Sequence, residues 1–110
     1  LGLVGSEMCI RDRRYTLGLK DRGHHILCEI SDENIIIPYY SRVPFPVGSV
    51  ITIVNTSDSS IGINIEGGVT DVLLAGEGYY SFYLIQAYGV VTLLNIGPDR
   101  WVISGNVNPD

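Results

Sequence analysis

A corner rich in proline and glycine, followed by an uninterrupted β-forming run, constrains this chain more than any other stretch. Two prolines and a glycine fall between residues 44 and 48. Proline fixes φ and cannot donate to a sheet ladder, and glycine permits turn geometries, so this segment predicts a rigid corner. The run at 49–55 is rich in β-branched side chains and predicts a strand. A polar segment at 56–60 separates it from a second predicted strand at 61–66, and together they predict a β-hairpin.

Short β-forming runs separated by glycine-rich turns occupy the rest of the chain. Further strands are predicted at 15–19, 25–30, 35–37, 70–74, 79–85, 90–96 and 100–104. No segment is long enough for a crossover helix, and 110 residues allow a single modest core. We therefore expect an all-β fold, a small antiparallel β-sandwich or flattened, jelly-roll-like barrel. One domain is expected over residues 14–107, with a short tail at 108–110.

Three of the predicted strands, 35–37, 79–85 and 90–96, carry apolar side chains on both faces. We expect the last two to lie in the middle of a sheet, joined by the turn at 86–89, with both faces covered. A two-layer β domain covers only the inner face of each sheet, so self-association is expected to cover the remainder. Trp101 shares a strand face with Ile103 and is predicted to anchor the core.

The first 13 residues, LGLVGSEMCIRDR, resemble translated sequencing-adapter text of the kind found at the ends of metagenome-derived reading frames. The segment has neither strand alternation nor a helical stripe. We expect it to be a non-native addition that contributes nothing to the fold.

Charge and hydropathy disfavour two classes of partner. The formal charge of −5 argues against nucleic acid, because phosphate binding needs clustered Lys and Arg. No apolar run approaches the roughly 20 residues of a membrane-spanning helix, and the N-terminus lacks the order of a signal peptide. We expect no nucleic-acid partner and no membrane insertion. Cys28 is predicted to be a small buried hydrophobic residue.

Residue types with catalytic potential occur without a catalytic pattern. His24 and His25 are adjacent, so in a strand they point to opposite faces and cannot chelate one metal. The glycines at 76 and 78 begin like a dinucleotide-binding fingerprint, but no helix follows, and we expect a turn. Acid pairs for glycoside hydrolysis could be drawn from Glu29, Glu66, Asp71 and Glu77. We expect no catalytic residue, no metal and no cofactor.

Tyrosines have the clearest binding potential, since an amphipathic ring can stack on a sugar or anchor a protein partner. The candidate interface or ligand-contact residues are Tyr39, Tyr40, Tyr79, Tyr83 and Tyr88. The alternative is that half or more of the tyrosines pack in the sheets with the hydroxyl at the surface.

Several of these features together resemble a domain common in tailed-bacteriophage virion proteins, including the C-terminal modules of tail fibres. The shared features are Ile37-Pro38 at a strand end, the Phe-Pro-x-Gly corner at residues 45–48, Gly68-Val69, and the closing strand from Trp101 to Gly105. The resemblance covers residues 25–107. Many such modules have a lysine in the strand before the tryptophan, where this chain has Asn95.

The resemblance implies a non-enzymatic virion structural module, the C-terminal domain of a tail-fibre or appendage protein involved in assembly or host attachment. It also implies a homo-oligomer, with a trimer favoured, and contacts with other virion proteins or a host-surface glycan. Two alternatives stay open. A carbohydrate-binding β-sandwich module would place several tyrosines on one exposed face, and a small β-fold enzyme, the less favoured, would need a cleft with converging polar groups.

We predict that removing residues 1–13 leaves stability unchanged. Thermal melts of the full chain and of a chain that starts at Arg14 should coincide. A fall in Tm of several degrees, equivalent to about 1 kcal/mol for a domain of this size, would show that the segment supports the fold.

Overall fold

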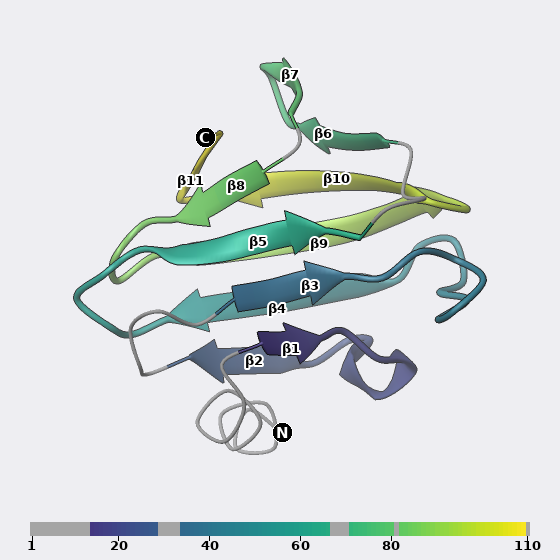
Figure 1. Ribbon diagram of the computed structural model, residues 1–110, viewed down its shortest axis with the longest axis horizontal. Coiled ribbons are helices and arrows are strands. Elements are labelled where there is room, and N and C mark those ends of the chain that lie inside the picture. The colour runs from purple at the N-terminus through teal and green to yellow at the C-terminus, as the bar shows by residue number, and fades with distance from the viewer. Residues whose placement is uncertain (1–13, 29–33, 67–70, 81, 110) are drawn as a thin grey trace.

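The computed structural model describes residues 14–28, 34–66, 71–80 and 82–109, and within them the chain forms two β-sheets packed face to face (Figure 1). Sheet A contains, in spatial order, β1 (Arg14–Thr16), β3 (Asn34–Ile37), β5 (Ile61–Ile65), β8 (Phe82–Ile85) and β11 (Val107–Pro109). Sheet B contains β2 (His25–Cys28), β4 (Val50–Asn55), β9 (Val90–Gly97), β10 (Arg100–Gly105), β6 (Asp71–Leu74) and β7 (Gly78–Tyr79). A 3₁₀ turn, η1 (Leu19–Asp21), lies between β1 and β2. The prediction of an all-β sandwich is confirmed.

Two segment boundaries were predicted, one near each end of the chain, and the structure bears only on the second. Residues 1–13, expected to be a non-native addition, lie outside the described part of the chain. At the other end, Asn108 and Pro109 were expected in a tail but belong to β11, where they pair with Leu84 and Tyr83 of β8. Their backbone therefore extends sheet A beyond residue 107.

The first five strands alternate between the two sheets, and this alternation makes both sheets mixed. β1, β3 and β5 are parallel neighbours in sheet A, and β2 and β4 are parallel neighbours in sheet B. Parallel neighbours need a long crossover connection, which is usually a helix. Here a strand of the opposite sheet is the crossover (Figure 1). The expectation of purely antiparallel pairing was wrong, because the absence of a helical segment excludes only a helical crossover.

Two predicted hairpins are instead connections between the sheets. β4 lies in sheet B and β5 in sheet A, so the polar segment at 56–60 joins the two layers. The turn at 86–89 likewise carries the chain from β8 in sheet A to β9 in sheet B. Polar and glycine-rich residues favour any reversal of direction, whether it returns to the same sheet or crosses to the other. β9 and β10 do form an antiparallel pair within sheet B.

The buried side chain of Asn55 organises the first of these connections. Its amide nitrogen donates to the carbonyl oxygens of Ser59 and Gln86 at 2.9 and 3.0 Å. Its Oδ1 accepts from the backbone nitrogen and the hydroxyl of Ser57 at 2.9 and 2.7 Å. These bonds satisfy backbone groups where the chain leaves sheet B, and they tie that point to the end of β8 in sheet A. A polar group can be buried here because its hydrogen-bonding capacity is used.

The space between the sheets holds alternate side chains of nearly every strand, isoleucine above all. Trp101 is 1% exposed and its ring meets that of Phe45 edge to face, with centroids 5.1 Å apart. The prediction that Trp101 anchors the core is confirmed, and so is the burial of Cys28. Phe45 belongs to the proline-rich corner, which is joined to β9 by a bond from the Gly48 nitrogen to the Asn95 oxygen.

We predict that Asn55→Asp destabilises the fold by roughly 3 kcal/mol, because it removes two donated bonds and leaves carbonyl oxygens without a donor inside the protein. Urea unfolding followed by Trp101 fluorescence measures the change. Asn64→Asp is the matched control: the Asn64 amide is partly buried and donates to Asn34 Oδ1 at 3.1 Å. The control should cost less than about 1 kcal/mol. Equal losses in the two variants would contradict the role assigned to Asn55.

Candidate functional site

The five candidate tyrosines do not form one site. Tyr83 is fully buried, and its hydroxyl donates to the Val72 oxygen at 2.6 Å, a bond from sheet A to sheet B. The Tyr80 backbone nitrogen donates to the same hydroxyl at 3.1 Å. Tyr83 is therefore a packing residue, and its assignment as a ligand contact was wrong. A lone tyrosine in an apolar strand does not reveal whether its hydroxyl meets solvent or a backbone carbonyl across the core.

Two exposed candidates lie at opposite ends of the sandwich. Tyr40 follows the end of β3, and its backbone nitrogen donates to the Asp99 carboxylate. Tyr88 follows the end of β8, and its backbone nitrogen donates to the Ser57 carbonyl oxygen. β3 is parallel to β5 and β5 is antiparallel to β8, so these strand ends point in opposite directions. Tyr79 lies on β7, at the edge of sheet B. A single aromatic platform for a sugar is therefore not formed by these side chains.

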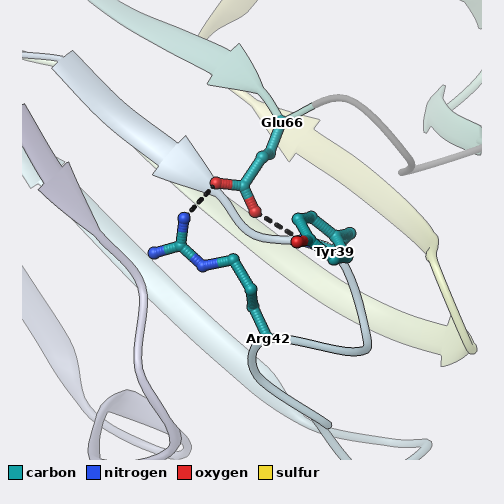
Figure 2. A network of polar contacts seen from close by, with 3 residues as sticks. All are labelled: Tyr39, Arg42 and Glu66. Atoms are coloured by element: carbon teal, nitrogen blue, oxygen red, sulfur yellow. Dashed lines mark hydrogen bonds and ion pairs between the residues drawn. The ribbon is translucent and has the colours of Figure 1, made fainter.

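Tyr39 belongs to a polar network at the end of β3 and β5 (Figure 2). Its backbone nitrogen donates to Glu66 Oε1 at 3.1 Å, and the guanidinium of Arg42 donates to Glu66 Oε2 at 2.7 Å. The Arg42 side chain is half exposed, so solvent screens this ion pair and it contributes at most about 1 kcal/mol. The network fixes the start of the connection from β3 to β4. Both oxygens of the Glu66 carboxylate already accept hydrogen bonds within it.

The other residues considered for chemistry lie on several different elements. His25 is exposed on β2, and Asp71 forms an ion pair with Arg100 with an oxygen–nitrogen distance of 3.3 Å. Gly76 has a φ of +83° in the connection between β6 and β7, which confirms the predicted turn. Glu29 lies outside the described residues. Within the described residues, no group of three or more His, Cys, Asp or Glu side chains is placed to hold a metal ion.

The outer face of sheet B carries a continuous line of apolar side chains that crosses five strands. The register pairs Val50 with Leu94, Leu94 with Val102, Val102 with Leu73, and Leu73 with Tyr79. Residues opposite one another in neighbouring strands share a sheet face, so these five side chains form a single row, called here the apolar row. Val50 is 39% exposed, Leu94 37% and Tyr79 58%, and Ile96 lies exposed beside them on β9.

A row of hydroxyl groups runs beside the apolar row on the same face. The register pairs Thr52 with Thr92 and Thr92 with Ser104, and His25 ends the row on β2. Farther along the strands, Val54 pairs with Val90 in a shorter apolar line. The face is therefore striped across its strands, with hydroxyls between two apolar lines.

The outer face of sheet A is organised differently. A Cβ atom at Gly62 would lie 2.6 Å from Asn34 Oδ1 and 2.9 Å from the ring of Phe82, so these two side chains lie over the glycine. Asn64 donates to Asn34 on the same face. Sheet A thus covers its outward glycine with its own side chains and mixes polar with apolar groups there.

Sequence reasoning anticipated apolar side chains on both faces of β9, but it missed their exposure and most of the apolar row. Residues 90–96 were expected to have both faces covered, yet Leu94 and Ile96 are exposed although β9 lies between β4 and β10. Nothing in the sequence indicated that Val50, Val102 and Leu73 belong to the row, because only the sheet order and register bring them beside Leu94. The one feature of the sequence that pointed to the row was the presence of apolar residues on both faces of 90–96.

Burial raises the pKa of the Tyr83 hydroxyl above its ordinary value of about 10, with the backbone N–H of Tyr80 acting in the opposite direction. The folded protein therefore holds this proton more tightly than the unfolded chain does. We predict that this contribution is complete below about pH 10 and is lost as pH rises through the folded pKa. Urea unfolding at a series of pH values up to about 11 measures the decline in the free energy of unfolding.

Tyr83→Phe should reduce the alkaline decline, while Tyr88→Phe, at a side chain 72% exposed, should leave it as in the parent. The same decline in Tyr83→Phe and the parent would assign the alkaline sensitivity to other groups.

No protein-family model, curated protein or solved structure matches this chain. Within the described residues, no helix has the length and apolarity that crossing a membrane requires. The strongest feature from which a function can be proposed is the exposed face of sheet B, with its apolar row.

Proposed function

We propose that this chain is a non-enzymatic structural module of a tailed-bacteriophage virion, the C-terminal domain of a tail-fibre or appendage protein involved in assembly or host attachment. The observation that carries the proposal is the apolar row on the outer face of sheet B. Contiguous exposed apolar surface on a small folded protein marks a contact with another molecule. A module built into an assembly would bury this face.

The sequence resemblance supports the same class of protein. The Phe-Pro-x-Gly corner and the strand from Trp101 to Gly105, which carry the resemblance, are both structural here: Phe45 and Trp101 meet in the core. A protein of this class works in the virion by contact with its own copies, with other virion proteins or with a host-surface glycan. The resemblance favours a trimer.

The carbohydrate-binding alternative has less support from the geometry. Such a module stacks sugars on aromatic rings that share an exposed face. Tyr40 and Tyr88 lie at opposite ends of the sandwich and Tyr83 is buried, so the candidate rings are not arranged in that way. Among the candidate tyrosines, Tyr79 points outward in line with other apolar groups, as part of the apolar row.

Self-association of the full chain is the direct test. We predict that sedimentation equilibrium over a micromolar concentration range gives a mass above the 12.0 kDa of one chain, and the resemblance favours three times that value. The physical reason is that association removes the apolar row from water. A single species at 12.0 kDa over the whole range would contradict a self-assembling module.

A further inference from the structure

The outer face of sheet B is close to electrically neutral, although the chain as a whole is not. The outward Asp, Glu, Lys, Arg and His side chains on its described strands are His25, Asp71 and Arg100, and the last two form an ion pair. The formal charge of the chain is −5, so two copies repel one another at most relative orientations. Contact through this face brings no uncompensated carboxylate against another. The face is therefore electrostatically suited to its own copy.

The size of the face suits a weak, reversible contact between copies. The six strands hold between two and eight residues and five on average, so at about 3.3 Å per residue and about 4.8 Å between strands the face covers roughly 450 Å². Two such faces bury about 900 Å² in total, which is below the area of most stable interfaces and within the range of weak encounters. The expected association is modest in strength, and high protein concentration favours it.

The stripes on the face restrict how two copies can meet. If the apolar row of one copy lies antiparallel on the apolar row of the other, about a two-fold axis that runs across the row, the hydroxyl rows of Thr52, Thr92 and Ser104 also face each other. A register that places hydroxyls on the apolar row would bury polar groups against Leu94 and Val102. That arrangement is unfavourable, because a buried hydroxyl without a hydrogen bond costs about 1–3 kcal/mol.

We propose that the outer face of sheet B binds the same face of a second copy of this chain, with apolar row against apolar row. The inference rests on the proposed function and adds the surface and the register of the contact. Leu94 and Val102, at the centre of the row on the two middle strands, then lie against the row of the other copy. Because both copies contribute the same face, the contact is isologous about a two-fold axis and closes at two copies, not at the three that the resemblance favours.

Charge substitutions placed in different copies test the contact. Leu94→Glu and Val102→Lys each bury an unpaired charge, so each variant alone should self-associate more than about tenfold more weakly than the parent. An equimolar mixture should recover the associated species in sedimentation velocity. In the mixture the introduced carboxylate of one chain and the introduced ammonium of the other can pair across the interface.

Ile36→Glu, half-buried on the outer face of sheet A, is the matched control and should associate like the parent. Trp101 fluorescence and urea unfolding establish that each variant is folded, and recovery in the mixture is itself evidence of folded chains. If both variants alone associate like the parent, the row is not the contact, and the proposal falls while the self-assembling module stands. Loss in both variants without recovery in the mixture overturns row-against-row contact. A parent that stays monomeric at every concentration assigns the face to a different partner and overturns both proposals.

Discussion

The hydrogen bonds of Asn55 satisfy the constraint on which this sandwich most depends, the passage of the chain from one sheet to the other. A strand that leaves its sheet exposes backbone donors and acceptors at the edge of the core, and each must find a partner. One carboxamide bonds Ser57, Ser59 and Gln86, which lie in two different connections between the sheets. Two crossings that are distant in the sequence are thereby joined at a single point.

Repeated crossing determines what each sheet exposes. Because the chain changes sheet after nearly every strand in its first half, both sheets receive parallel neighbours without any helix to cover them. Parallel sheets in other architectures are covered on both faces. Here the inner faces enclose the core, while the exposure of each outer face depends on the side chains of that sheet. Sheet A lays Phe82 and Asn34 over Gly62, whereas sheet B leaves Leu94 and Ile96 exposed.

The contrast between the two outer faces gives the proposed function its physical basis. Sheet B gathers apolar side chains from strands as far apart in sequence as β4 and β10 into one row, and it compensates the charge of Asp71 with Arg100. Two polar groups elsewhere are engaged in hydrogen bonds: the Glu66 carboxylate with Tyr39 and Arg42, and the Tyr83 hydroxyl with the Val72 oxygen of the other sheet. The proposal of a function by surface contact rests on this distribution of apolar and charged groups.

Local sequence determined most of the strands, the rigid corner and the burial of Trp101, because alternation, β-branched side chains and proline act over a few neighbouring residues. The single strand predicted at 79–85 was wrong, since β7 and β8 belong to different sheets. Local sequence also indicated that residues 90–96 have an apolar outer face. The sheet to which each strand belongs was decided only by the tertiary structure, since the same turn chemistry at 56–60 serves a hairpin or a crossing. Tertiary structure likewise decided the burial of Tyr83 and the alignment of Leu94 in the apolar row. Sheet order and register are set by long-range packing, which no local pattern encodes.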